Sequence, residues 1–224
     1  SAILYPPRLQ EILIFTILIF ISKFLYDFIK DKNQINLFFI CLCLNLLIWI
    51  KAEGIAYAFM CLVTINFISS LNLKQRLYIN IFFLFIILFK IFVYKFFEIK
   101  VNAQPYYFEY MISLDMKTLI YKIKNIILYL TYYSIKNIIL MFVPIIIVIN
   151  YKKIFKDEYL KLMTLIFLMN LMFIFSAYLF RDMEVVYSLK TTIDRIIFSS
   201  SGLYLLLIII QFKSFFLKIS KDFF

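Results

Sequence analysis

A short polar cluster, Lys51-Ala52-Glu53-Gly54, interrupts two apolar runs and contains residue types that bind charged groups. It places a cation, a carboxylate and one of the two glycines of the chain within four positions. Glycine is expected here because a tight reversal often requires a positive φ. Lys51 and Glu53 are therefore candidates for binding a polar headgroup or a sugar. The alternative is a simple reversal whose charged side chains lie in water.

A second cluster combines the segment Arg181-Asp182-Met183-Glu184 with Thr191-Thr192-Ile193-Asp194-Arg195. Two of the four arginines of the chain share this stretch with three carboxylates. The planar guanidinium group is suited to bidentate contact with phosphate. Ligand binding and a salt-bridge network closed on itself both remain open for the cluster. The candidate binding residues are Arg181, Glu184, Asp194 and Arg195.

Several kinds of chemistry are excluded by what the sequence lacks. It contains no histidine, so neither a histidine base nor a histidine metal site can form. It also lacks a P-loop, a dinucleotide-binding glycine motif, the H-E-x-x-H motif and a Gly-x-Ser-x-Gly elbow. The net charge of +11 is dispersed beside apolar runs, which argues against nucleic-acid binding. We expect no cofactor and no metal site in the sequence, although a dependence on a divalent metal is left open.

The composition defines the elements that must position these clusters. Apolar residues make up 65% of the chain and the mean hydropathy is +0.95, well above the roughly 45–50% apolar content of soluble domains. Almost purely apolar runs recur between short charged loops, and their length suits helices that cross a hydrocarbon core of about 30 Å. The sequence therefore predicts an all-α, polytopic transmembrane helical bundle that forms a single domain.

About seven spans are predicted, together with one interfacial amphipathic helix. The interfacial helix is expected over Val101 to Asn125, where tyrosines alternate with lysines. The expected spans are Ile12 to Ile29, Ile35 to Ile50, Gly54 to Leu71, Leu77 to Phe97, Ile126 to Ile149, Leu160 to Phe180, and Ile196 to Phe212.

The basic residues predict the orientation of the bundle, because cytoplasmic loops carry an excess of Lys and Arg. Alternate loops hold most of these cations, and we expect them and the C-terminus to be cytoplasmic in a multi-pass protein of the cell (inner) membrane. The Lys51 junction and the loop from Arg181 to Arg195 then face outward. The basic loops contain Lys30 and Lys32, Lys74 and Arg76, Lys152, Lys153, Lys156 and Lys161, and Lys213, Lys218 and Lys221.

A Lys-x-Glu-Gly element that opens a span, followed by a late Thr-x-x-Asp-Arg element before the last span, resembles motifs of polytopic glycosyltransferases of the GT-C class. The similarity is to lipid-phosphate-sugar-dependent, mannosyltransferase-like enzymes of bacterial membranes. It implies transfer of a sugar from a polyprenyl-phosphate donor to a glycan or lipid acceptor on the extracytoplasmic face. It also implies that Lys51, Glu53, Asp194 and Arg195 hold the donor or acceptor.

In that family the catalytic carboxylate lies in the first extracytoplasmic loop, and no segment of this chain matches that loop. We therefore expect residues 1–224 to be the C-terminal portion of a longer enzyme, without an assigned catalytic residue. Three alternatives remain. They are an O-antigen ligase or polymerase, a multi-span transporter or flippase, and a structural membrane subunit.

Overall fold

The computed structural model describes residues 8–99, 115–181 and 184–222, and in these ranges the chain forms eight α-helices and no strand. The side chains of residues 52 and 214–222 are outside this description. The prediction of an all-α bundle is confirmed. The helices are α1 (Leu9–Asp31), α2 (Gln34–Ile50), α3 (Ala52–Asn66), α4 (Leu73–Phe96), α6 (Met116–Lys136), α7 (Ile138–Ile149), α8 (Glu158–Leu179) and α9 (Val185–Asp222).

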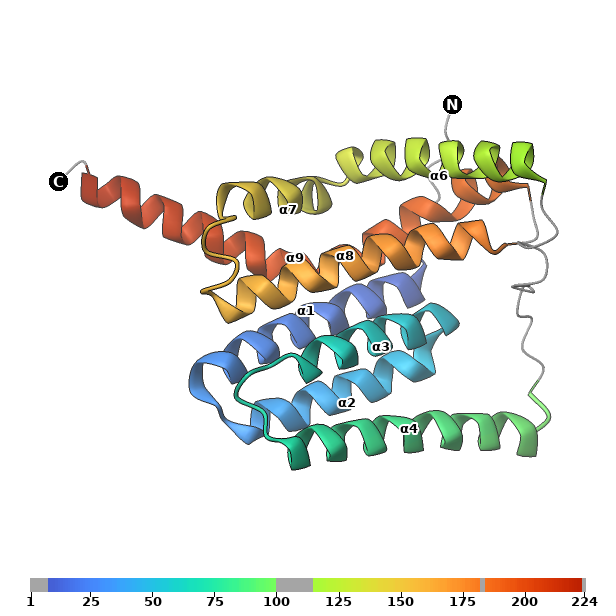
Figure 1. The fold of residues 1–224 in the computed structure, drawn as a ribbon. Helices are drawn as coiled ribbons and strands as arrows, with labels where there is room; N and C mark the ends of the chain where they lie inside the picture. Colours follow the sequence, from blue (N-terminus) through green and yellow to red (C-terminus); the bar gives the residue numbers. More distant parts are fainter. Residues whose placement is uncertain (1–7, 100–114, 182–183, 223–224) are drawn as a thin grey trace.

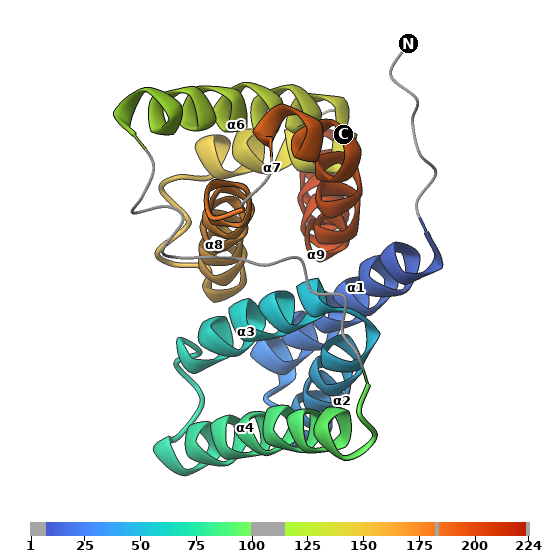
Figure 2. The ribbon, with the colours of Figure 1, turned by 90° about the vertical axis from the view of Figure 1, so that its right-hand side faces the viewer.

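The helices are stacked in layers that are visible end-on (Figure 2). Helix α4 lies at one side of the stack against α2, and α1, α2 and α3 form the next layer. Helices α8 and α9 follow, and α6 and α7 cover them on the far side. The contact between α1 and α9 joins the first and last parts of the chain. Residues far apart in the sequence can therefore meet at that contact.

The number of membrane-spanning helices is smaller than predicted. By length and composition, α1, α4, α8 and α9 can each cross a membrane within the described ranges, and the bent pair α6–α7 makes a possible fifth span. Helices α2 and α3 have 17 and 15 residues. At 1.5 Å per residue they measure about 25 and 22 Å, less than the hydrocarbon core of about 30 Å. By length and composition the described residues contain four or five candidate spans rather than about seven, although α2 and α3 run between the same two ends of the bundle as α1 and α4 (Figure 1).

The predicted span from Ile126 to Ile149 is broken in the structure. Helix α6 ends at Lys136, and α7 begins at Ile138 with a bend of 96°. Asn137 lies at the break with an extended backbone, and its side-chain oxygen caps α7 by accepting a hydrogen bond of 3.0 Å from the Leu140 backbone N–H. Of the predicted interfacial helix, residues 101–114 lie outside the described residues, and Met116 onward belongs to α6.

A second correction concerns the predicted outward loop from Arg181 to Arg195. Helix α9 already begins at Val185, so most of this segment is the first three turns of a helix. The carboxylate of Glu184 accepts a hydrogen bond of 3.1 Å from the Tyr187 N–H, which satisfies one of the free N–H groups at the helix start. A polar helix start is easily taken for a loop because its hydropathy is low.

The outer surface of the bundle is apolar, as a lipid-facing surface must be. Helix α1 buries a stripe at helical spacing, consisting of Ile14, Leu18, Ile21, Leu25 and Phe28. Helix α4 instead exposes large side chains around most of its circumference, including Ile81, Phe82, Leu84, Phe85, Leu88, Phe89 and Phe92. This distribution identifies a multi-helix membrane protein.

Both glycines lie where two helices approach closely. A Cβ atom on Gly202 would lie 2.3 Å from the Phe15 carbonyl oxygen, and one on Gly54 would lie 2.0 Å from the Leu47 carbonyl oxygen. Small residues allow such approaches between membrane helices. Neither glycine has a positive φ, so the expectation that Gly54 supplies a left-handed conformation is wrong. Its role is to let α3 contact α2.

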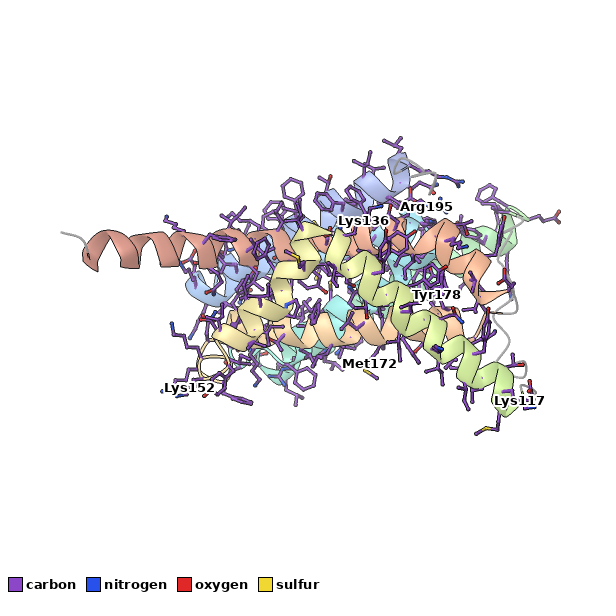
Figure 3. All side chains as sticks on the ribbon, turned by 90° about the horizontal axis from the view of Figure 1, so that it is seen from above. Lys117, Lys136, Lys152, Met172, Tyr178 and Arg195 are labelled. Carbon is purple, nitrogen blue, oxygen red and sulfur yellow. The ribbon has the colours of Figure 1, made fainter. Side chains whose placement is uncertain are left out.

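The basic connections gather at one end of the bundle. The α1–α2, α3–α4 and α7–α8 connections lie together at the left in Figure 1. The start of α1, the α2–α3 junction and the start of α9 lie at the other end. Seen from above, Lys152 marks the basic end, whereas Lys117 and Arg195 lie toward the opposite end (Figure 3). The two polar clusters singled out in the sequence therefore belong to the same end.

Candidate functional site

A charged pocket lies where the start of α1, the α2–α3 junction and α9 meet. The Lys51 ammonium group is 3.2 Å from the Glu11 carboxylate and 3.1 Å from the Glu53 carboxylate. The Arg195 guanidinium group is 3.8 Å from the same oxygen of Glu11. Glu11 is thus the common partner of two cations that are 144 positions apart in the sequence.

Local structure explains why these side chains converge. Glu11 lies in the first turn of α1, where free N–H groups favour a negative charge. Lys51 has an extended backbone between α2 and α3, and this directs its side chain across the junction toward α1. Arg195 projects from α9, the helix that packs most extensively on α1. The site therefore depends on three separate segments.

The pocket encloses about 30 Å³, enough for one water-sized group. Tyr57 lines it and donates a hydrogen bond of 3.1 Å to the Ile196 carbonyl oxygen, which ties α3 to α9. Thr192 also lines it, and its hydroxyl is 2.7 Å from the Tyr178 hydroxyl of α8. These contacts fix the walls, so the pocket accommodates a hydroxyl group but not a whole sugar.

Two buried polar atoms of the pocket have no hydrogen-bond partner among the described residues. They are Glu11 Oε2 and Arg195 Nε. The Glu11 side chain is only 3% exposed. A buried acceptor without a partner costs about 1–3 kcal/mol, so this oxygen has a strong tendency to accept a hydrogen bond from a group that enters. An isolated salt-bridge network does not account for that unused oxygen.

Of the six residues predicted from the sequence, three are brought together. Lys51, Glu53 and Arg195 all line the pocket. Arg181 and Glu184 are not among its lining residues. The Arg181 carbonyl oxygen instead accepts a hydrogen bond of 2.8 Å from Lys122, and Glu184 caps α9. Asp182 and Met183, from the same cluster, lie outside the described residues.

Asp194 is adjacent to Arg195 in the sequence but faces another neighbour. Successive residues of an α-helix point about 100° apart, so the two side chains leave α9 in different directions. Asp194 interacts electrostatically with Tyr133 of α6. Arg195 therefore lines the pocket, and Asp194 is not among its lining residues.

Sequence analysis did not select Glu11 as a site residue. The feature of the sequence that could have pointed to Glu11 is its position, a single carboxylate directly after Leu9-Gln10 where an apolar run begins. Such a residue is usually a solvated helix start, so sequence position alone does not distinguish it. Tyr57 was missed because a tyrosine within an apolar run is usually interpreted as a residue of the hydrophobic core. In the described part of the chain, no group of three or more acidic or cysteine side chains could hold a metal ion.

Fold and site together define the class: an all-helical membrane protein with a buried carboxylate–cation site at one end of its bundle. Comparison with known proteins adds no narrower assignment. No family model, no curated protein and no solved structure matches the chain.

Replacing Tyr57 with phenylalanine should lower the free energy of unfolding by about 1 kcal/mol, the usual net value of one hydrogen bond. The variant loses the bond from Tyr57 to the Ile196 carbonyl oxygen but keeps the ring in place. Thermal unfolding of the purified protein in detergent would measure the change. Tyr132→Phe is the matched control, because Tyr132 is 58% exposed. Equal loss of stability in both variants would contradict the role of the Tyr57 hydroxyl.

Proposed function

We propose that this chain acts in a membrane glycosyltransferase that moves a sugar from a polyprenyl-phosphate donor to an acceptor hydroxyl on the extracytoplasmic face. The observation that carries the proposal is the buried Glu11 carboxylate, held by Lys51 and Arg195, with one oxygen that has no partner among the described residues. Glycosyl transfer needs this combination: a carboxylate to accept the acceptor proton and cations to stabilise the departing phosphate.

The step is a single displacement at the anomeric carbon. Glu11 Oε2 accepts the proton of the acceptor hydroxyl, whose oxygen bonds to the anomeric carbon. The bond from that carbon to the lipid phosphate breaks, and the phosphate leaves with the electron pair. The transition state has oxocarbenium character, as in other glycosyl transfers. The pocket admits the acceptor hydroxyl, and the sugar and phosphate lie across its mouth.

Charge balance links the two halves of this step. In the resting pocket two cations, Lys51 and Arg195, face two carboxylates, Glu11 and Glu53. When Glu11 takes a proton it becomes neutral, and one positive charge is left uncompensated. That charge then stabilises the phosphate at the moment it leaves, in surroundings where electrostatic interactions are stronger than in water.

The proposed orientation follows from the basic connections. In Figure 1 they lie at the end of the bundle opposite the start of α1 and the α2–α3 junction, whose residues line the pocket, and lysine-rich loops are generally cytoplasmic. The pocket is then extracytoplasmic, at the level where the phosphate of a polyprenyl carrier meets water. This location supports a lipid-linked donor over a soluble nucleotide sugar.

Replacement of Arg195 with alanine tests the proposal. We expect transfer to fall roughly 10²–10³-fold, as when one donor that stabilises transition-state charge is removed, and Arg195→Lys to restore part of it. The assay follows sugar transfer in membranes from a panel of polyprenyl-phosphate hexoses. Arg8→Ala is the control, because Arg8 is an exposed arginine at the start of α1. Unchanged transfer and donor affinity in Arg195→Ala would overturn the proposal.

A transporter or flippase is the second candidate, favoured by one specific observation. The 96° bend between α6 and α7 interrupts an apolar stretch, and broken helices often form transport sites. Transporters usually carry such breaks in pairs, and the described residues contain one bent pair. A flippase would move the lipid carrier without cleaving its phosphate–sugar bond, so product analysis in the same assay separates the two candidates.

A further inference from the structure

A groove separate from the charged pocket lies between α2 and α4. It encloses about 390 Å³, within the range of small-molecule sites. Its walls are mainly apolar, with amide groups at intervals. They include Gln34, Leu42 and Asn45 of α2, and Gln75, Tyr78 and Phe82 of α4.

The dimensions of the groove match one leaflet of a bilayer. Gln34 and Asn45 lie about 16 Å apart along α2 at 1.5 Å per residue. Half of a hydrocarbon core of about 30 Å is about 15 Å. Large apolar side chains line the groove yet stay open to the outside, since Leu42 and Phe82 are each 45% exposed. The groove therefore has the length and the walls to hold one extended acyl chain.

The mouth of the groove is basic. Gln34 is the first residue of α2 and Gln75 the third residue of α4, and both helices begin at the end of the bundle where the basic connections gather (Figure 1). Lys32 precedes Gln34 by two positions and Lys74 directly precedes Gln75, and both are exposed. The acidic residues at this end include Asp31, the last residue of α1, and Glu158, whose carboxylate accepts hydrogen bonds from Ser69 of the α3–α4 connection. The remaining positive charge at headgroup level attracts anionic lipid, at about 1 kcal/mol for each lysine.

We propose that this groove binds one molecule of an anionic phospholipid, with an acyl chain between α2 and α4 and the phosphate against Lys32 and Lys74. Charge at the mouth and leaflet-length apolar walls together specify this occupant. The site is independent of the proposed transfer reaction, because the groove opens at the end of the bundle opposite the charged pocket.

The only tryptophan of the chain provides a probe beside the groove. Trp49 Nε1 donates a hydrogen bond of 3.0 Å to the Asn45 side chain, and Trp49 is 37% exposed. The full chain is placed in nanodiscs of phosphatidylcholine that contain small fractions of phosphatidylglycerol brominated near the acyl-chain end. Because bromine quenches on contact, brominated phosphatidylglycerol should reach half-maximal quenching at a mole fraction at least fivefold lower than brominated phosphatidylcholine.

Charge reversal at the mouth tests the headgroup contact. Lys32→Glu with Lys74→Glu should remove the difference between the two brominated lipids. Lys117→Glu with Lys124→Glu makes the same change in charge on exposed residues of α6 and should preserve it. Identical quenching by both lipids in the wild-type protein would mean ordinary surrounding lipid only and would overturn the proposal. Protection of Trp49 from both lipids, as expected for a helix of a second copy in the groove, would also overturn it.

Discussion

Glu11→Gln should lower transfer by roughly 10²–10⁴-fold, the usual contribution of a general base. Glutamine has nearly the same shape but cannot accept the proton of the acceptor hydroxyl. The carboxylate is the partner of both Lys51 and Arg195, so its neutralisation also leaves Arg195 without its counter-charge. The measurement is kcat/KM for sugar transfer, with donor binding determined separately.

The matched control for this prediction is Glu53→Gln. Glu53 belongs to the same pocket and pairs with Lys51 at 3.1 Å, but its side chain is 29% exposed rather than 3%. We expect transfer to fall less than about 10-fold, because exposed ion pairs contribute only about 0–1 kcal/mol. Nearly wild-type transfer by Glu11→Gln, or a greater loss in Glu53→Gln, would assign the base elsewhere. Glu11→Asp keeps the charge and separates loss of the base from loss of folding.

Gly202→Ala should destabilise the protein by about 3 kcal/mol, at the upper end of ordinary overpacking. The added Cβ would lie 2.3 Å from the backbone oxygen of Phe15, which no rotamer change can relieve. Helices α1 and α9 must then separate and disturb the stacked rings of Phe15 and Phe198, whose centroids are 4.9 Å apart. Thermal unfolding can be followed with a thiol-reactive dye, since Cys43 and Cys61 are free and buried.

Ser201→Ala is the control for the glycine substitution. Ser201 is buried beside Gly202, and its hydroxyl donates a hydrogen bond to the Phe198 carbonyl oxygen of its own helix. Its removal adds no atoms between α1 and α9, so we expect a change below about 1 kcal/mol. If Gly202→Ala were as stable as Ser201→Ala, the close contact between α1 and α9 would be wrong.

Hydropathy was sufficient to predict the long apolar helices. The predicted spans Leu77 to Phe97 and Leu160 to Phe180 correspond closely to α4 and α8. Hydropathy could not predict the break at Asn137, because one asparagine in an apolar run is equally compatible with a continuous helix. It also misread the start of α9, where polar side chains face neighbouring helices rather than water. Both errors arise because hydropathy measures solvent preference and not hydrogen-bond geometry.

The candidate site was predictable in part. Lys51, Glu53 and Arg195 were selected because cations and carboxylates are rare beside apolar runs, and the structure places these three in one pocket. Asp194 was selected with Arg195 as part of the Thr-x-x-Asp-Arg element, but it is not among the residues that line the pocket. Glu11 depends on a contact between the first and last described helices, and a single sequence contains no information on that distance.

The close contact at Gly202 affects the geometry of the charged pocket from a distance. Gly202 lies seven residues beyond Arg195 on α9, and Phe15 lies four beyond Glu11 on α1, so both contacts fall along one helix crossing. The distance between the backbones of α1 and α9 at Gly202 thus sets the distance between the Glu11 carboxylate and the Arg195 guanidinium group, about two turns away. Side chains of increasing size at position 202 would separate α1 from α9 by increasing amounts. Such substitutions would change the reactivity of the pocket without changing any residue inside it.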